Sequence, residues 1–210
     1  MAAASGGFLM EAVWMRFNPL VQRLAGLVED GSLGEIRSLS AAFGFRAAYD
    51  PSGRLWDPAL GGGALLDLGI YTVDLAHLLL GTPTGVEARG SLAPTGVDQE
   101  SSLLLSFASG ARALLAQSLV ADLPGTALVV GSRGWARLGD EFHAATTLVV
   151  ETDRGRLEEA VDDVRTGYAG ELEEVARCRA AGLAQSPRMP WSASLTDMRV
   201  LDEARRALVS

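Results

Sequence analysis

The run 61–74, GGGALLDLGIYTVD, constrains the fold and function of this chain more than any other stretch. Its glycines predict a turn, and the apolar residues after them predict a helix over 64–80. Asp67 and Tyr71 are four residues apart, about one helical turn, so they are expected on one face of that helix, with Asp74 on the same side. Polar side chains inside an apolar helix are costly unless they are paired or used. This face is therefore the first candidate for a functional site.

The flanking sequence predicts a sheet with helices. Asn18 as N-cap and Pro19 at the first helical position begin a helix that ends near Gly31. Residues 8–17 are expected to be extended or irregular. Strands are expected at 35–45, 86–92, 99–107, 111–119, 126–130, 135–138, 146–151 and 156–160, and further helices at 168–181 and 195–208. Consecutive strands with short turns predict an α+β fold, an open and mainly antiparallel sheet with helices packed on one face.

Composition narrows the classes of function. The chain is acidic, with a net charge of −8 over 210 residues, and all 18 of its basic residues are arginine. Because these arginines are scattered, we expect no nucleic-acid partner. Cys178 is the only cysteine, which excludes an intrachain disulfide and favours a reducing compartment, so we expect a cytoplasmic protein. No stretch approaches ~20 uninterrupted apolar residues, and no basic region precedes the apolar N-terminus, so neither a membrane span nor a signal peptide is predicted.

Each candidate residue also has a purely structural interpretation. The glycines at 61–63 could present amides to an anion, but no parallel strand precedes them and no Gly-x-Gly-x-x-Gly or Walker-type motif occurs. Asp67 could cap the helix start, and Tyr71 could be a half-buried core tyrosine. The two histidines have no ligand spacing, so no metal site is expected. The simplest interpretation of Cys178 is packing, and solvated surface is the simplest for Asp162, Asp163, Glu171, Glu173 and Glu174.

Three segments, in order along the chain, carry a resemblance to a known family. They are FLMEAVWMRFNP at 8–19, WDP followed by GGGALLDLGIY within 56–71, and GY, MPW and MRVLD within 167–202. On these motifs the chain resembles the C-terminal domain of the glucose–fructose oxidoreductase and inositol dehydrogenase family (Gfo/Idh/MocA). It is most similar to the branch of dimeric dihydrodiol dehydrogenase and D-xylose dehydrogenase.

The resemblance implies how the chain is organised. Members of the family place a dinucleotide-binding Rossmann domain, with a catalytic lysine in a Glu-Lys-Pro motif, before the region that this chain resembles. We therefore expect residues 1–17 to be an arm left from the interdomain connection and 18–210 to be a substrate and dimerisation domain. The same resemblance implies a homodimer through one face of the sheet. The family cofactor is NAD or NADP, and we expect this chain alone not to bind it tightly.

The resemblance also assigns roles to residues. Its motif places the general acid/base at Tyr71 and the paired carboxylate at Asp67, and it implies substrate contacts at Trp14, Arg16 and Phe43. A free phenol has a pKa of about 10 and needs a nearby cation to act near neutral pH. The missing lysine would supply that charge, and Arg16 is the candidate substitute.

Two classes of function remain open. In the first, this domain oxidises a sugar or cyclic diol by hydride transfer, together with a cofactor domain on a longer chain or on a separate subunit. In the second, it is a non-catalytic sheet domain that dimerises or binds a sugar-like ligand.

Overall fold

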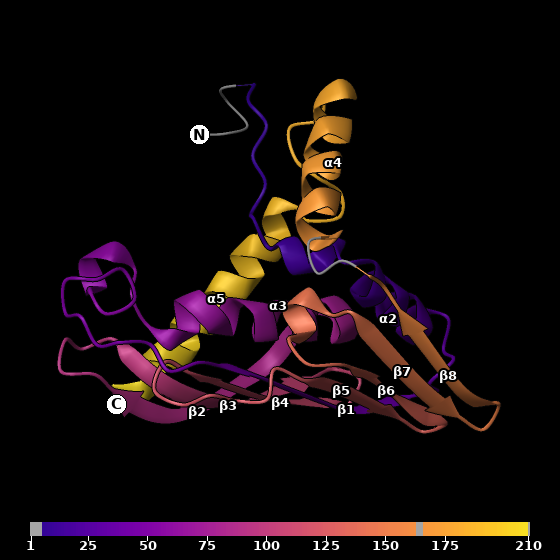
Figure 1. Ribbon diagram of the computed structural model, residues 1–210, viewed down its shortest axis with the longest axis horizontal. Coiled ribbons are helices and arrows are strands. Elements are labelled where there is room, and N and C mark those ends of the chain that lie inside the picture. The colour runs from indigo at the N-terminus through magenta and orange to yellow at the C-terminus, as the bar shows by residue number, and fades with distance from the viewer. Residues whose placement is uncertain (1–5, 163–165, 210) are drawn as a thin grey trace.

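The computed structural model describes residues 6–162 and 166–209. Within them, one open sheet of eight strands carries helices on one face, so the expected α+β fold is confirmed (Figure 1). The strand order is β2-β3-β4-β1-β5-β6-β7-β8, and every neighbouring pair is antiparallel except β1 and β4. The strands are β1 (Ile36–Gly44), β2 (Pro83–Leu92), β3 (Asp98–Phe107), β4 (Arg112–Ser118), β5 (Ala127–Gly131), β6 (Gly134–Leu138), β7 (Thr147–Thr152) and β8 (Gly155–Ala160).

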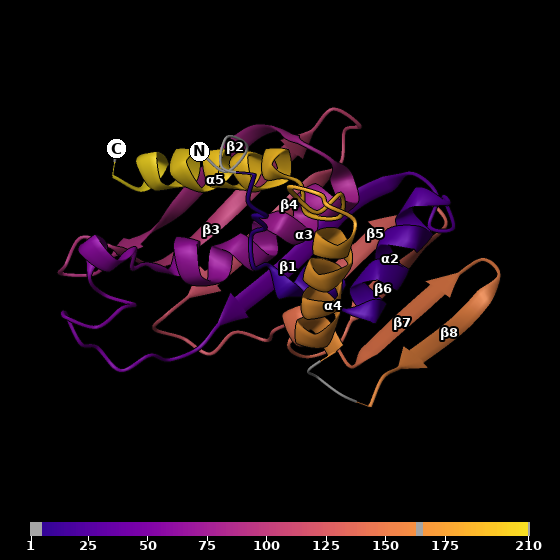
Figure 2. The same cartoon turned by 90° about the horizontal axis from the view of Figure 1, so that it is seen from above.

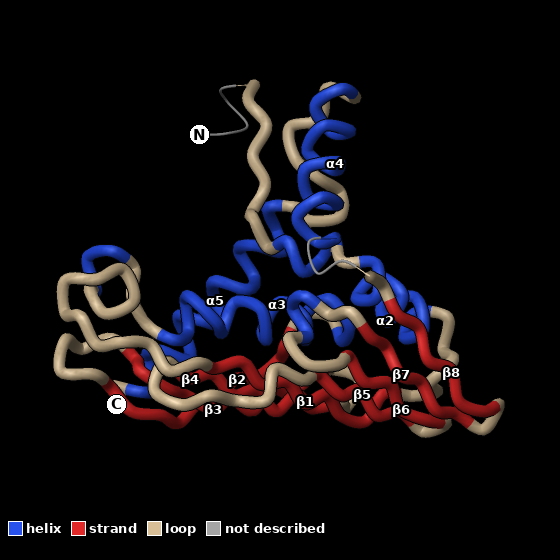
Figure 3. Tube along the Cα trace, in the orientation of Figure 1, coloured by secondary structure: helices blue, strands red, loops and turns tan. Residues whose placement is uncertain are grey.

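The helices form a second layer above this sheet. They are α2 (Pro19–Glu29), α3 (Ile70–Leu80), α4 (Thr166–Ala180) and α5 (Trp191–Leu208). Seen from above, α5 lies along β2 at one edge, α3 crosses β1 and β4, and α2 covers β6 and β7 (Figure 2). By contrast, α4 and the N-terminal segment from residue 6 stand upright, away from the sheet (Figure 3). The opposite face of the sheet carries no helix in the described part of the chain.

The first helix begins as the sequence predicts. Oδ1 of Asn18 accepts hydrogen bonds from the amides of Leu20 and Val21, at 2.8 and 3.4 Å, and Pro19 occupies the first helical position. The side-chain nitrogen Nδ2 of Asn18 donates to the carbonyl of Ala145 at 3.0 Å. The cap therefore both starts α2 and ties it to the far end of the sheet.

Two of the boundaries that differ from expectation lie near the ends of the chain. The segment 8–17 ends in a short helical turn, η1 (Trp14–Phe17), whose residues are all buried. The last helix begins at Trp191, four residues early, because the extended Pro190 precedes it and the side chain of Gln185 accepts from the amide of Trp191 at 2.7 Å. The proposed arm at 1–17 therefore ends inside the core, while its standing as a remnant of an interdomain connection stays a prediction.

The helix expected over 64–80 is interrupted near its start. Leu65–Gly69 forms a π-helical turn, η3, and the α-helix proper begins at Ile70. A π turn has more residues per turn than an α turn, so side chains four residues apart are no longer stacked across it. This irregularity lies between Asp67 and Tyr71, the two residues that the motif pairs.

The apolar character of this segment comes from its position in the core. By length and composition Pro58–Leu80 could cross a membrane: an 18-residue window within it has a mean hydropathy of 1.4, yet 61% of that window is buried inside the protein. Val73, Leu75 and Ala76 of α3 have no exposed surface and pack into the main hydrophobic core. The core helix of a soluble domain passes the same test, so the absence of a membrane span stays a prediction.

The central strand β1 separates the two faces of the sheet. Leu39, Ala41 and Phe43 point toward the helices and join the core, whereas Ser40 and Ala42 lie on the open face. Phe43 is next to the last residue of the strand, so its ring reaches the space beneath the start of α3. The strand end therefore positions a side chain of the candidate site.

Candidate functional site

Tyr71 lies in the first turn of α3 and is half-buried. Its hydroxyl accepts a hydrogen bond from Nε1 of Trp14, which η1 presents, at 2.9 Å. The two rings meet edge to face with centroids 6.0 Å apart, and Phe43 approaches the same phenol at 5.8 Å. The structure thus brings together three residues that the resemblance selects from distant parts of the chain.

Two further rings complete this group. His143, from the short turn η4 (Phe142–Ala144), stacks on Phe43 with centroids 4.1 Å apart and lies 5.6 Å from the ring of Tyr71. Tyr168, from α4, stacks on Trp14 at 4.3 Å. We call these five residues, Trp14, Phe43, Tyr71, His143 and Tyr168, the aromatic cluster. Sequence reasoning missed the role of His143, because nothing near it in the sequence points to the end of β1.

His143 is neutral at physiological pH. Burial lowers its pKa to about 4. Its Nδ1 is buried and has no hydrogen-bond partner among the described residues. The ring is held by stacking alone, so it contributes an uncharged, polar wall to the cluster.

Asp67 does not pair with Tyr71 directly. Its Oδ1 accepts a hydrogen bond from Nη1 of Arg54 at 2.5 Å, and no hydrogen bond joins it to the phenol in the described structure. The π-helical turn Leu65–Gly69 contains Asp67, so the four-residue spacing to Tyr71 does not stack the two side chains as it would in a regular α-helix. The carboxylate still lies close enough that its charge raises the pKa of Tyr71.

Asp98 occupies the helix start, where the sequence suggested either a cap by Asp67 or an external anion bound by the glycine amides. Oδ2 of Asp98 accepts from the amide of Leu65 at 2.6 Å. Gly63, with a φ of 120°, packs against the same carboxyl, and a Cβ there would lie 2.3 Å from Oδ1. Burial raises the pKa of Asp98 to about 6. The glycine turn therefore serves a side chain of the protein itself, and Asp67 is not the cap.

Arg16 is not placed to help Tyr71. Its Nε donates to both oxygens of Asp74, at 2.7 and 3.0 Å, and both side chains are buried. Asp74 consequently faces Arg16 of η1, the same short helix whose Trp14 bonds to Tyr71, whereas Asp67 bonds to Arg54. The cation that the phenol requires does not come from this arginine in the described structure, because Asp74 holds its guanidinium.

The surroundings of Tyr71 favour its protonated form. Burial raises the pKa of Tyr71 most, the hydrogen bond from Trp14 lowers it, and the nearby Tyr168, Asp67 and Glu171 raise it further. Glu171 has a buried Oε1 without a hydrogen-bond partner among the described residues, and burial raises its pKa. A phenol in this setting needs an added positive charge before it can act as a base near neutral pH.

The interpretation of the acidic residues of α4 as solvated surface needs correction. Glu174 is buried and accepts hydrogen bonds from Ser186 and Arg177, which together lower its pKa to about 2. Glu171 lies beside the aromatic cluster, as its effect on the pKa of Tyr71 indicates. Only Glu173 of the three is exposed as expected. Of the acidic pair 162–163, the structure describes Asp162, which is exposed, and position 163 lies outside the described residues.

A βαβ dinucleotide-binding unit is not found among the described residues. The one parallel strand pair, β1 with β4, is separated in sequence by α3, β2 and β3, so the described part of the chain contains no βαβ unit. The glycine turn, which could have held a phosphate, is filled by Asp98. No group of three or more histidine, cysteine or acidic side chains among the described residues could hold a metal ion.

Comparison with known proteins places this chain in a family. The family model described as the GFO/IDH/MocA C-terminal domain matches residues 21–137. The trans-1,2-dihydrobenzene-1,2-diol dehydrogenases of Mus musculus and Danio rerio are each 34% identical to this chain over 215 aligned positions. The alignments cover 99% and 98% of the chain but 64% and 63% of those enzymes, so the chain spans somewhat less than two thirds of these relatives.

Solved structures agree in fold. An aldose–aldose oxidoreductase from Caulobacter crescentus superposes with a TM-score of 0.86 at 26% identity, covering 98% of this chain and 63% of that one. A 3-ketoreductase from Actinomadura kijaniata superposes with a TM-score of 0.81 at 22% identity over 98% of this chain and 64% of its own, which speaks for the fold alone. The family match and these relatives together establish that the chain belongs to the Gfo/Idh/MocA family and carries its C-terminal domain.

Proposed function

We propose that this chain is the substrate-binding and catalytic domain of an NAD(P)-dependent oxidoreductase that acts on a sugar or cyclic diol. The observation that carries the proposal is the hydroxyl of Tyr71, held by the indole of Trp14 at 2.9 Å within the aromatic cluster. Aromatic faces stack against sugar and diol rings, and a positioned phenol is a suitable acid/base for an alcohol proton. The dihydrodiol dehydrogenase relatives, at 34% identity, support this class of substrate.

In this proposal each residue has a definite task. Tyr71 takes the proton of the substrate hydroxyl while nicotinamide, when supplied, accepts hydride from the carbon. Trp14 orients the phenol, and Phe43, His143 and Tyr168 form the walls. Asp67, paired with Arg54, acts on Tyr71 only through its charge. Arg16, which is committed to Asp74, is left out of the substrate contacts.

The cofactor has to come from outside the described residues. We propose that a dinucleotide-binding domain, on a longer chain or on a separate subunit, brings both NAD(P) and the cation that lowers the pKa of Tyr71. This chain alone is then expected to bind NADH and NADPH too weakly to saturate at micromolar concentration. Fluorescence titration with both nucleotides checks this.

We further propose that the open face of the sheet pairs with a second copy in a homodimer. Leu104, Ser40 and Leu128 follow one another across β3, β1 and β5, with Leu114 of β4 between the first two, and Leu114 is 55% exposed. A sheet face with exposed apolar side chains of this kind favours association. Sedimentation velocity at micromolar concentration should give a dimer mass, and Leu114→Glu should give a monomer. A monomeric wild type would refute the dimer.

A binding experiment tests the substrate proposal without the cofactor. The chain should bind trans-1,2-dihydrobenzene-1,2-diol or D-xylose saturably in calorimetry, and Tyr168→Ala should weaken that binding about tenfold. Tyr49→Ala, which removes an exposed tyrosine outside the cluster, is the matched control. Equal effects of the two substitutions would argue against a pocket at the cluster. Binding without activity, once a cofactor domain is supplied, would instead favour a sugar-binding module.

A further inference from the structure

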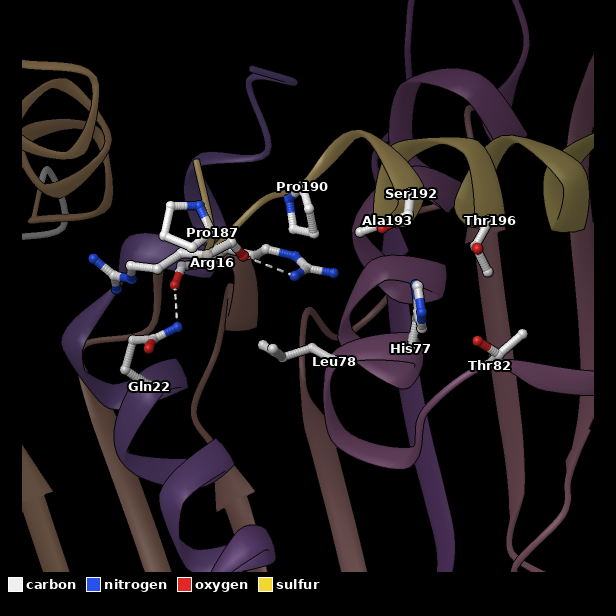
Figure 4. A pocket seen from close by; sticks show the side chains of 11 residues that line it. Arg16, Gln22, His77, Leu78, Thr82, Pro187, Pro190, Ser192, Ala193 and Thr196 are labelled. Carbon is white, nitrogen blue, oxygen red and sulfur yellow. Dashed lines mark hydrogen bonds between the residues drawn. The ribbon is translucent and has the colours of Figure 1, made fainter. Parts of the chain in front are cut away.

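A cavity lies apart from the aromatic cluster. It has a volume of about 480 Å³, lies between η1, the end of α3 and the start of α5, and shares no lining residue with the cluster (Figure 4). Its charged or polar lining residues are Arg16, Gln22, His77, Thr82, Arg188, Ser192 and Thr196. The dehydrogenase chemistry proposed for Tyr71 makes no use of this space.

Arg16 presents a free donor to the cavity. Its side chain is about nine-tenths buried, its Nε is bound by Asp74, and its Nη1 donates to the carbonyl of Arg188 at 3.0 Å. Nη2 has no hydrogen-bond partner among the described residues. Figure 4 shows the guanidinium directed into the space bounded by Pro190, Leu78 and His77. Nη2 is not among the buried polar atoms that lack a partner, so this donor is open to the cavity and can donate to a bound acceptor.

His77 faces Arg16 across this space in a fixed orientation. Its Nδ1 lies 2.7 Å from Oδ1 of the fully buried Asp197, and its side chain is 15% exposed. A carboxylate on Nδ1 fixes the ring and leaves Nε2 available to the cavity. His77 therefore offers a positioned ring nitrogen to the cavity.

Two buried carboxyls, those of Asp74 and Asp197, lie behind the cavity. Asp74 and Asp197 lie side by side, and burial together with the neighbouring Asp197 raises the pKa of Asp74 despite Arg16. Arg188 has no carboxylate partner in the described structure, and its guanidinium is held over the ring of Phe17 at 4.8 Å.

The remaining wall supplies neutral donors. Ser192 and Thr196 belong to the first two turns of α5, an 18-residue helix whose N-terminus is at the cavity. The helix dipole adds a partial positive charge there. Figure 4 shows the hydroxyls of Thr196 and Thr82 on the side of the cavity where His77 lies.

We propose that this cavity binds a small oxyanion, the phosphate or carboxylate group of a metabolite, through Arg16, His77 and Arg188. The lining contains groups that recognise such anions: two arginines, an oriented imidazole, hydroxyl donors and a helix N-terminus. The volume is large enough for a small molecule that carries the anion, with Leu78 and Pro190 against its apolar part.

The two histidines of the chain provide the test. His77 lines the cavity and His143 belongs to the aromatic cluster, so their ring resonances report separately on the two sites in one NMR spectrum, with His77→Gln giving the assignment. The chain is titrated with inorganic phosphate and, separately, with malonate, at constant ionic strength in sodium chloride. The His77 resonance should shift saturably while that of His143 stays in place. The probe that causes the shift identifies the group as phosphate or carboxylate.

A matched pair of variants separates binding from general charge effects. Arg188→Gln should weaken the binding of the anion about tenfold. Arg199→Gln removes an exposed arginine of α5 that does not line the cavity, and it should leave the binding of the anion unchanged. No shift of His77 with either probe, a shift of His143 alone, or equal weakening by both variants would each overturn the proposal. None of these outcomes bears on the role of Tyr71, because the two sites share no residue.

Discussion

The indole Nε1 of Trp14 donates a hydrogen bond to the hydroxyl of Tyr71 across 57 positions of sequence, at 2.9 Å. This contact joins η1 to the start of α3 and fixes the direction of the phenol. It also leaves the hydroxyl proton free to point toward a ligand, since the oxygen accepts from Trp14. The pair is the structural basis of the proposed acid/base.

Removing the hydroxyl should cost stability. Tyr71→Phe leaves Nε1 of Trp14 without an acceptor in a partly buried position, so the free energy of unfolding should fall by about 1–2 kcal/mol. Urea unfolding measures this. Tyr49→Phe, at an exposed tyrosine, should change stability by less than about 0.5 kcal/mol. Equal values for the two variants would mean that the hydrogen bond contributes nothing measurable.

The phenol of Tyr71 should titrate above its ordinary range in this chain alone. Burial raises its pKa and the donation from Trp14 opposes that rise. The difference in absorbance at 295 nm between wild type and Tyr71→Phe should therefore show a pKa above 10, and Trp14→Phe should move it higher still. A pKa at or below 10 would reveal a cation near Tyr71 that the described residues do not supply.

The two ion pairs of this region should differ in their contribution to stability. Asp74→Asn leaves the buried guanidinium of Arg16 without its carboxylate and should destabilise the fold by about 3 kcal/mol or more. Asp67→Asn breaks a pair whose Arg54 is 68% exposed, and should cost less than about 1 kcal/mol. Chemical unfolding of both variants at pH 7 makes the comparison. A larger loss for Asp67→Asn would contradict the assignment of Arg16 to Asp74.

Stability should fall in mild acid because of His143. Its pKa is about 4 in the folded chain, against an ordinary value of 6.5, so between these values the unfolded state binds more protons. The free energy of unfolding therefore rises with pH over this window. On acidification from pH 6.5 to pH 4, it should decrease by about 3 kcal/mol.

The variant His143→Phe isolates this effect. Asp98 titrates in the same window with the opposite sign, because its pKa is raised to about 6, but it is common to both proteins and cancels in their difference. Unfolding curves of wild type and His143→Phe should converge or cross as the pH falls toward 4. Parallel curves from pH 4 to pH 7 would show that His143 is not held neutral.

The sheet and most helices follow from local patterns. Alternation along β1 and the cap at Asn18 are set by neighbours in sequence, and both appear where they are expected. The π-helical turn at Leu65–Gly69 could not be predicted, since nothing in an apolar run distinguishes it from an α-helix. That irregular turn interrupts the α-helical spacing between Tyr71 and Asp67, whose carboxylate bonds to Arg54.

The candidate site was only partly visible in the sequence. Trp14, Phe43 and Tyr71 were reached through the family motif, and the structure brings them together. His143 lies 72 positions after Tyr71, on a three-residue turn whose place depends on how β6 and β7 pair. Arg16 was predicted to serve the phenol, but its buried pairing with Asp74 is a tertiary contact that no local pattern encodes.

The most direct test of the central claim is the turnover of a chimera. This chain is fused behind the Rossmann domain of a full-length family member, and oxidation of trans-1,2-dihydrobenzene-1,2-diol and D-xylose is followed by NADPH or NADH formation. The account predicts activity with at least one substrate, a fall in kcat of at least about 100-fold in Tyr71→Phe, and no change in Tyr49→Phe. Undiminished kcat in Tyr71→Phe, or a folded chimera that binds cofactor but oxidises neither substrate, would contradict it.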